Sequence, residues 1–381
     1  MNGVLPMLTW GTWDDTEWTH ANGTTELPVA ATLPEAVNCA ASSKKQRSIR
    51  KLRKKALQAP KNSQLWFEEL LERLESTSFG RDKANYHCNP LKCLHTVGDS
   101  RSETATKIPW IDLPDGIHPR DGKLSAQRAE NKQQQVDNLA VFLQRILRPG
   151  DVVVEFCAGS GYVALPLACL YSHCTFVLLD KKEPSLAIAK ERIAAAHLTN
   201  VEIFCGFIDD YCKPFDVGIA LHACGEATDM VMQKCLAERA AYVLAPCCVG
   251  KIRLSEWVYP RSAALAAELS RTEYEVLARA ADFGHSSTDA VAQMDINRRR
   301  RRCKTLLESD RNICAEEALY DTFMFIMHPA TATPKNDVLV GIPRNLSVGQ
   351  NTTRDVNRFF QLACDDMLST DLLVRKAMLS T

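Results

Sequence analysis

The sequence predicts an α/β fold of the Rossmann-like type, a largely parallel sheet with helices on both faces. Three observations predict it. An apolar run breaks into a glycine turn at Asp151–Gly161, a second apolar run ends in an acid at Phe176–Asp180, and strand-like and helix-like segments alternate regularly from residue 125 to residue 250. Parallel strands need helical crossovers, and their carboxyl ends meet at one edge of the sheet, where such folds bind ligands.

The glycine turn is the most informative stretch. The β-branched run Val152–Val154 predicts a buried strand, and the sequence C-A-G-S-G that follows lets a ligand approach backbone N–H groups, because a Cβ would block it. A dinucleotide fold expects G-x-G-x-x-G, whereas this loop offers Cys157-x-Gly159-x-Gly161. The acids that close the first two strands, Glu155 and Asp180, suit a nucleoside with free ribose hydroxyls.

Residues 1–118 are expected to be an N-terminal extension, partly disordered. It carries eight Lys/Arg within Lys44–Lys55 and one amphipathic helix at Asn62–Glu75, whose apolar face we expect to dock on the main domain. The cluster His87, Cys88, Cys93 and His95 offers four soft ligands, but its spacing matches no familiar zinc pattern. Coincidence in a cysteine-rich chain is the favoured interpretation, and no metal site is assigned.

Residues 119–343 form the predicted catalytic domain. A helix begins at Ser125 and stops before Arg148-Pro149-Gly150. Later strands are expected to end at Asp180, Asp209-Asp210, Leu221 and the A-P-C-C-V-G stretch, with a last strand at Asp321–Met327, and the intervening helices follow Tyr162, Glu183 and Gly225. Residues 344–381 are a tail with a helix candidate from Thr353.

Composition limits the class of protein. Lys+Arg and Asp+Glu both total 46, so global charge carries no argument. Fifteen cysteines, an odd number, without a signal peptide predict reduced thiols in a cytoplasmic or nuclear protein. The longest nearly apolar run, Tyr162–Leu179, contains Pro166 and is expected to be a helix plus a strand, so no membrane span is predicted.

The order acid-x-Cys-x-Gly-x-Gly resembles motif I of the class I S-adenosylmethionine methyltransferases, usually acid-x-Gly-x-Gly-x-Gly. With L-H-A-C-G-E-A-T-D at Leu221–Asp229 and A-P-C-C-V-G at Ala245–Gly250, the chain resembles the methyltransferase domain of the glutathione S-transferase C-terminal domain-containing protein family over about residues 120–343. The resemblance implies S-adenosyl-L-methionine as cofactor, and the contacts expected for it are Glu155, Cys157, Gly159, Gly161, Tyr162, Asp180 and Asp209.

A more distant similarity is to the tRNA acceptor-stem 2′-O-methyltransferases, whose strand end reads K-H-x-C-G-x-A-T-D. This chain has Leu221 in place of their Lys and Val249 in place of a downstream His. Three catalytic candidates remain. His222 is a candidate general base, Cys224 a candidate nucleophile, and Asp229 is either catalytic or a helix cap. Cys247 and Cys248 are further candidate nucleophiles, but packing around the cofactor is the default interpretation for all three cysteines.

The acceptor is left open. Two basic runs, Lys44–Lys55 and Arg298–Arg302, favour RNA such as tRNA, and the second is expected in a loop near the substrate side; a solvated surface explains both equally well. The alternatives are a methyltransferase acting on protein or small molecules, and a cofactor-binding scaffold whose catalysis has decayed.

Overall fold

The computed structural model describes residues 63–93, 107–122, 124–252, 255, 257–282 and 295–344. The predicted basic run Lys44–Lys55 and the helix expected from Thr353 lie outside these residues.

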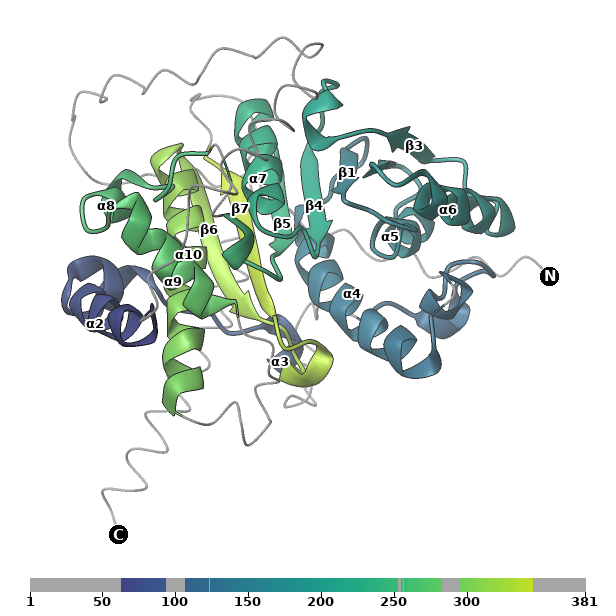
Figure 1. The fold of residues 1–381 in the computed structure, drawn as a ribbon. Helices are drawn as coiled ribbons and strands as arrows, with labels where there is room; N and C mark the ends of the chain where they lie inside the picture. The colour runs from purple at the N-terminus through teal and green to yellow at the C-terminus, as the bar shows by residue number, and fades with distance from the viewer. Residues whose placement is uncertain are drawn as a thin grey trace, which may run out of the picture.

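A seven-stranded sheet in the order β3-β2-β1-β4-β5-β7-β6 forms the centre of the molecule (Figure 1). Its strands are β1 (Val152–Phe156), β2 (Thr175–Asp180), β3 (Val201–Cys205), β4 (Val217–Leu221), β5 (Ala241–Ala245), β6 (Tyr320–Ile326) and β7 (Asp337–Pro343). The first five are parallel, and β7 runs antiparallel to both of its neighbours. The Rossmann-like prediction is confirmed.

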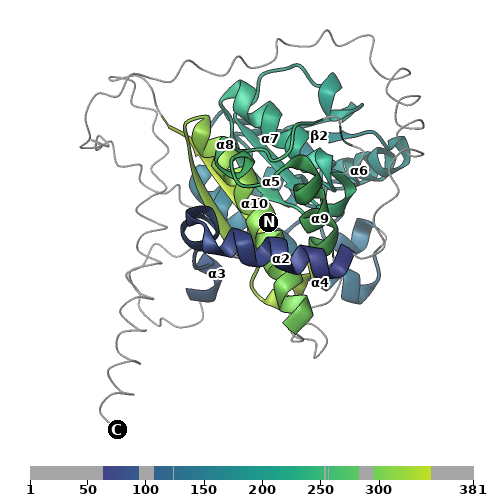
Figure 2. The same cartoon turned by 60° about the vertical axis from the view of Figure 1, so that its left-hand side comes forward.

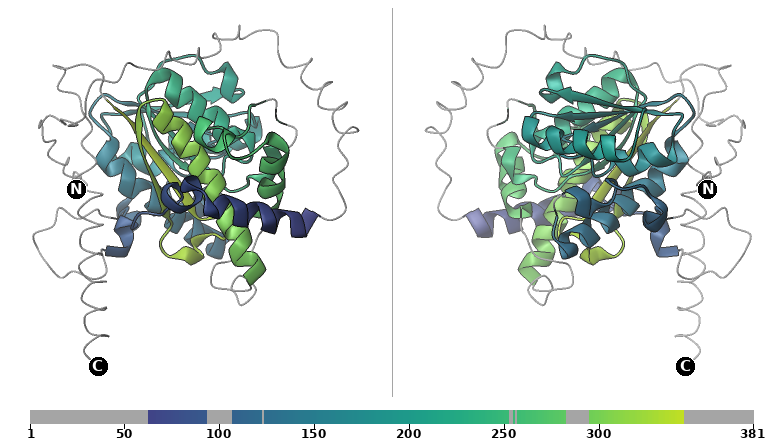
Figure 3. Two further views of the ribbon diagram at one scale, coloured as in Figure 1. Left: turned by 90° about the vertical axis from the view of Figure 1, so that its left-hand side faces the viewer. Right: turned by 90° about the vertical axis from the view of Figure 1, so that its right-hand side faces the viewer.

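Helices cover both faces because successive strand residues point to opposite sides. Val153 faces the cluster that includes α4 (Ala126–Ile146), α5 (Ala164–Leu170) and α6 (Glu183–Ala195), whereas Val154 faces α7 (Glu226–Glu238) and α10 (Asp295–Glu317). Figure 3 shows the molecule from its two opposite sides, with the side that carries α2 and α10 at the left. β4 and β5 are buried throughout, and β1 and β2 are buried apart from their first residues. β3, at the edge of the sheet, is only partly buried.

Two parts of the sheet differ from the prediction. The third strand ends at Cys205, and Ile208–Asp210 form a separate 3-10 turn. The last predicted strand corresponds to β6, but β7, which was not predicted, inserts between β5 and β6. β7 contains Gly341 and ends in Pro343, residues that usually argue against a central strand. Gly341 is required there, because a Cβ would lie 2.1 Å from the ring of Tyr242.

The basic stretch Arg298–Arg302 lies in a helix, and the expectation of a loop is wrong. It forms the first half of α10. Arg302 donates hydrogen bonds to the carbonyls of Gly80 and Ala84 and pairs with Glu75 at 3.0 Å, and Arg301 pairs with the buried Asp337 at 2.8 Å. Two of the five arginines of this basic run therefore hold the fold together.

The amphipathic helix predicted at residues 62–75 is α2 (Ser63–Ser76), and it lies across α9 (Arg271–Ala281) and α10 (Figure 2). Phe67, Leu70 and Leu74 join a hydrophobic cluster that is separate from the sheet. Many of its other members come from α8 (Ala263–Ala266), α9 and α10, so a helical layer is added outside the α/β core. The predicted docking of this helix is confirmed.

The described part of the expected N-terminal extension is built into the same core. Tyr86 donates a hydrogen bond to Asp337 at 2.6 Å, and the Asn89 amide donates to Asn138 and to the carbonyl of Ile326, both at 2.8 Å. Ile108 and Ile117 are buried with the residues of α4. These described segments therefore pack directly on α4, β6 and β7. Among the helices of the described ranges, none is long and apolar enough to cross a membrane.

Candidate cofactor and catalytic site

The loop between β1 and α5 has the conformation that the glycine turn predicts. Cys157, Gly159 and Gly161 all have positive φ values, of 58°, 58° and 75°. A Cβ on Gly161 would lie 2.4 Å from the Leu178 side chain, so that glycine is needed for packing. A Cβ on Gly159 would meet nothing within 4 Å, which means that open space lies above the loop. This space is where the backbone can receive a ligand.

Asp180 closes β2 beside this space. Its carboxylate accepts hydrogen bonds from the N–H groups of Gly159 and Lys182, both at 2.8 Å, through different oxygens. Each oxygen keeps a lone pair for a ribose hydroxyl. Asp180 is thus fixed in place before the ligand arrives, as expected of a ribose-binding acid.

Glu155 lies below the loop. It is 2% exposed and accepts a hydrogen bond from the N–H of Ala164 at 2.8 Å, at the first turn of α5. Burial raises the pKa of this carboxyl to about 7, against the hydrogen bonds from Ala164 and Val163. This position favours an indirect role, in which Glu155 sets the shape of the loop, over the direct cofactor contact expected from the sequence.

The turn after β3 offers a place for a flat base. Phe207 is 46% exposed there, an unusual degree for a large apolar side chain, and Lys181 lies over its ring at 5.8 Å. Asp209 follows two residues later and is also exposed. An apolar ring beside an acid suits the adenine of a nucleoside, whose amino group donates a hydrogen bond.

Tyr162 ties a neighbouring segment to the loop. Its hydroxyl donates to the carbonyl of Gly122 at 2.7 Å, and Arg192 lies over its ring at 4.9 Å. The buried Arg192 guanidinium donates to the carbonyls of Gly116, Ile117 and Ser160 at 2.6–2.7 Å. The segment 116–122 is therefore held against the cofactor loop by one arginine that no local sequence pattern identified.

These residues fit S-adenosylmethionine, since an open glycine cradle, a ribose acid and an adenine platform lie in sequence order at the ends of β1, β2 and β3. Asp180→Ala is expected to weaken cofactor binding by at least about tenfold, because charge-assisted hydrogen bonds are worth about 1.5–3 kcal/mol each. Isothermal titration calorimetry measures this, with Asp216→Ala, at the opposite end of the sheet, as control. Unchanged affinity would show that Asp180 does not bind the ribose.

Three side chains meet on the acceptor side of this site. Gln135 on α4 accepts hydrogen bonds from the Lys132 ammonium at 3.2 Å and from Nε2 of His222 at 2.9 Å. Its own amide nitrogen donates to the carbonyl of Ala332 at 2.9 Å, which fixes which end of the amide faces His222. Nε2 must then carry the proton, because Gln135 presents an acceptor, and Nδ1 is the free acceptor of the neutral ring.

The electrostatics of this group single out Lys132. Burial lowers the pKa of Lys132 to about 8, although Glu155 and Cys247 favour its charged form. Burial, with the charge of Lys132, lowers the pKa of His222 to about 4. A base with a pKa near the working pH is the more effective one. Lys132 is therefore a better candidate base than His222, which the sequence suggested.

The three cysteines of the fourth and fifth strand ends converge. The Cys224 and Cys247 sulfurs lie 2.8 Å apart, and those of Cys247 and Cys248 lie 3.6 Å apart. The hydrogen bond from Cys224 and burial raise the pKa of the Cys247 thiol. A thiol held protonated is a poor nucleophile, so covalent catalysis by this group is disfavoured in the structure as it stands.

Asp229 has a structural position. It is 1% exposed, forms a bidentate ion pair with Arg311 at 2.9 and 3.0 Å, and accepts a hydrogen bond from the Tyr259 hydroxyl at 2.7 Å. Arg311 also binds Glu308 at 2.8 Å and the carbonyl of Gly225 at 3.1 Å. This network joins α7 to α10, which favours a structural role for Asp229 over the catalytic alternative.

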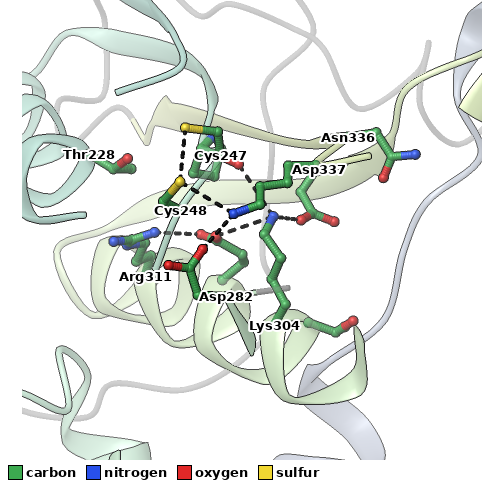
Figure 4. Close-up of polar contacts among 12 residues, drawn as sticks. Thr228, Cys247, Cys248, Asp282, Lys304, Arg311, Asn336 and Asp337 are labelled. Atoms are coloured by element: carbon green, nitrogen blue, oxygen red, sulfur yellow. Dashed lines mark hydrogen bonds and ion pairs between the residues drawn. The ribbon is translucent and has the colours of Figure 1, made fainter. Parts of the chain in front are cut away.

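The neighbouring polar contacts on α10 run toward β5 and β7 (Figure 4). Lys304 pairs with Asp337 and donates to the carbonyl of Pro246 at 3.3 Å, so this part of α10 lies level with the carboxyl end of β5.

The His87 cluster is only partly described. The His87 ring packs against Phe323 and Phe325 at 5.3 and 5.6 Å, and the Cys88 thiol contacts the carbonyl of Asn89 at 3.8 Å. The side chain of Cys93 and all of His95 lie outside the described residues. The four-residue zinc set is therefore not tested.

Comparison with known proteins supports the assignment. Residues 131–255 match the family model described as a methyltransferase domain. The glutathione S-transferase C-terminal domain-containing protein of Xenopus laevis is 38% identical over 239 residues, which are 62% of this chain and 38% of that protein. The chain thus spans under two fifths of the length of this relative.

Two further comparisons are weaker. Ribosomal RNA small subunit methyltransferase G of Lachnoclostridium phytofermentans is 21% identical over 164 residues, 43% of this chain and 64% of that protein. The solved structure of P. horikoshii TYW2 in complex with MeSAdo overlaps 57% of this chain and 62% of its own with 11% identity and a TM-score of 0.31, too low to add to the argument. Residues 131–255 of the chain therefore match a methyltransferase domain, and the chain is similar over 239 residues to the glutathione S-transferase C-terminal domain-containing protein of Xenopus laevis.

Proposed function

We propose that the protein transfers a methyl group from S-adenosylmethionine to a proton-bearing oxygen or nitrogen of RNA, with Lys132 as the general base. The observation that carries the catalytic part is the contact of Lys132, Gln135 and His222 beside the cofactor loop. Lys132 also lies over the ring of Tyr162 at 5.5 Å, directly after that loop. Lys132 thus lies between the cofactor loop and the strand ends, where a base could remove a proton from the acceptor.

Each residue has a distinct part in this proposal. The cofactor supplies an electrophilic methyl group. Asp180 and the loop at Gly159 hold the nucleoside, so that the acceptor meets the methyl group in one orientation. Neutral Lys132 accepts the acceptor proton, Gln135 orients both Lys132 and His222, and the free Nδ1 of His222 accepts a hydrogen bond from the acceptor or from water.

Two observations support RNA as the acceptor. One relative carries the name of a ribosomal RNA methyltransferase, although it is distant. The first turns of α10 also lie beyond the carboxyl end of β5, because Lys304 contacts Pro246 and Arg298 is six residues, about 9 Å, further along the helix. The side chains of Arg298 and Arg299 are 64% and 38% exposed and share Asp295, so phosphates can compete for them.

The direct test is to incubate the full chain with cofactor labelled on its methyl group and, separately, with total RNA and with RNase-treated cell lysate. Label in the RNA fraction supports the proposal. Label found only in protein or in small molecules would show that RNA is not the acceptor, while the proposed methyltransferase activity would remain. Cofactor binding without any transfer would leave the decayed scaffold as the remaining function.

RNA binding is expected to fall steeply as salt rises, because phosphate contacts release counterions. The double substitution of Arg298 and Arg299 by Gln should reduce the slope of log K against log salt by about 1.4, at about 0.7 per contact for a single strand. Filter binding across a salt series measures it. Arg302 is unsuitable for this test because it holds Gly80 and Ala84.

The control is Lys213→Gln, which removes one exposed charge beside Glu202 at the other end of the sheet order. It should leave the slope unchanged. If wild-type protein retains no RNA even at low salt, the RNA part of the proposal fails. If Lys213→Gln reduced the salt slope as much as the arginine substitutions do, RNA would be bound by general electrostatic attraction and not at a defined surface of the protein.

A further inference from the structure

Three thiols from two neighbouring strand ends meet in one place. Cys224 follows β4, and Cys247 and Cys248 follow β5. Their sulfur atoms all lie within 4.8 Å of one another, and they are the one such group of three metal-ligating side chains within the described ranges. Figure 4 shows the sulfurs of Cys247 and Cys248 turned toward each other.

The backbone conformation after β4 and β5 brings the three sulfurs together. His222, with a positive φ of 69°, bends the chain directly after β4, and its N–H bonds the carbonyl of Ala245 at 3.0 Å. Gly225, with a φ of 62°, turns it again, and its N–H bonds the carbonyl of Cys248 at 2.7 Å. A non-glycine residue with positive φ is uncommon and costs free energy, so the turn at His222, two residues before Cys224, indicates a constraint beyond chain connection.

From this convergence we infer a zinc site made by the thiolates of Cys224, Cys247 and Cys248. Sulfur is the ligand that zinc prefers in proteins, at about 2.3 Å, and three sulfurs of a tetrahedral site then lie about 3.8 Å apart. The 3.6 Å pair already has this spacing, and the 2.8 Å pair must open by about 1 Å. Two sulfurs at 2.8 Å are inside van der Waals contact, so separation around a cation relieves that contact.

The surroundings suit such a site. The Lys335 ammonium lies 3.3 Å from the sulfur of Cys248 and is held there by an ion pair with Asp282 at 2.5 Å. A positive charge beside a sulfur stabilises the thiolate. Three thiolates give zinc a net negative charge of one, which Lys335 offsets. On binding, each thiol gives its proton to the solvent, and no electron is transferred.

Three protein ligands leave the fourth coordination position of the zinc open. Catalytic zinc sites have this pattern, whereas structural zinc sites have four protein ligands. The site lies next to the proposed base, because Cys247 is among the groups whose charge acts on Lys132. It also lies near the cofactor loop, since Cys224 acts in the same way on Cys157. The cation would thus join the ends of β4 and β5 beside the reacting groups.

The experiment is metal titration of the full chain after removal of bound metal by a chelator, with a non-thiol reductant present. Cobalt(II) replaces zinc as the spectroscopic probe, because thiolate ligands give it intense charge-transfer absorption. We expect one equivalent bound through thiolates, displaced by zinc, with release of protons. Cys224→Ser, Cys247→Ser and Cys248→Ser should each weaken binding by at least about 100-fold, more than the loss of an outer-shell partner.

Two controls make the test specific. Cys205→Ser and Cys212→Ser remove exposed thiols elsewhere and should change nothing. The double variant Cys88→Ser with Cys93→Ser removes the competing cluster and should also retain the cobalt signal. Circular dichroism confirms that each variant is folded, and each serine keeps the size of the thiol.

Three results would overturn the proposal. The first is a reduced wild-type protein that binds neither cobalt nor zinc. The second is a signal that disappears in the Cys88/Cys93 variant and survives in the three serine variants of the strand ends. The third is recovery of a Cys224–Cys247 disulfide by alkylation and mass spectrometry from protein that binds no metal, which would make the pair a redox couple. None of these outcomes depends on methyl transfer, so the proposed function stands or falls separately.

Discussion

Lys132→Met is expected to lower kcat by about 10²- to 10⁴-fold, the range over which general bases contribute, while the affinity for S-adenosylmethionine changes little. Methionine keeps the length and packing of the side chain and removes the proton acceptor. Because burial lowers the pKa of Lys132 to about 8, the wild-type rate should rise about tenfold per pH unit below 8 and level off above it. Single-turnover rates of the wild type and of Lys132→Met across pH 6 to 9 measure both the loss of rate and the pH dependence.

The pH profile separates catalysis from packing. Lys132→Arg keeps the positive charge but cannot act as a base at these pH values, so it should be as slow as Lys132→Met and lose the slope. Lys190→Met, an exposed lysine on α6, is the matched control and should behave as wild type. If the slope survives in Lys132→Met, Lys132 is not the base. His222 would not produce this slope above pH 6, because burial lowers the pKa of its ring to about 4 and the ring is already neutral there.

Arg311→Leu is expected to destabilise the protein by about 3–5 kcal/mol, the largest stability effect we predict. Removing the guanidinium leaves Asp229 and Glu308, at 1% and 0% exposure, with only their longer ion pairs of 3.6 Å to Arg261 and Lys304. The penalty comes mainly from these two buried carboxylates, which each lose their shorter ion pair. Urea denaturation followed by circular dichroism measures the change in the free energy of unfolding.

A matched surface pair shows whether burial is the cause. Lys213→Ala breaks the exposed pair with Glu202 and should cost at most about 1 kcal/mol. The double variant Arg311→Leu with Asp229→Leu should recover part of the loss, because it removes one of the stranded charges. A loss below 1 kcal/mol for Arg311→Leu alone would show that water reaches these carboxylates and that the network is not a structural link between α7 and α10.

The strand ends could be predicted from the sequence because apolar runs that close on an acid or a glycine are local signals. The space above Gly159 and the position of Asp180 follow from such runs. Helix α10 could not be predicted in this way. Its buried face includes Lys304, Glu308, Asp310 and Arg311, so apolar periodicity fails where charged side chains pair inside the protein.

The acceptor side was predicted only in part. The role of Lys132 depends on Gln135, three residues away, and on His222, which is 87 residues distant from Gln135. Likewise Asp229 was ambiguous because its partner Arg311 is 82 residues further along. Contacts at such separations leave no spacing rule in a single sequence. A single sequence therefore indicates candidate residues but not the partners that each side chain contacts.

The insertion of β7 between β5 and β6 has a consequence for synthesis. The chain makes β1 to β5 in order, but the free edge of β5 has to wait for Asp337–Pro343, almost a hundred residues later, before it is paired. The early segment that carries Tyr86 and Asn89 waits longer still, since its partners Asp337 and Ile326 follow 251 and 237 residues later. While the ribosome produces the residues between, an exposed strand edge and an unattached segment coexist on one nascent chain. Because of this strand order, formation of the final hairpin of β6 and β7 is the step that both pairs the edge of β5 and attaches the early segment.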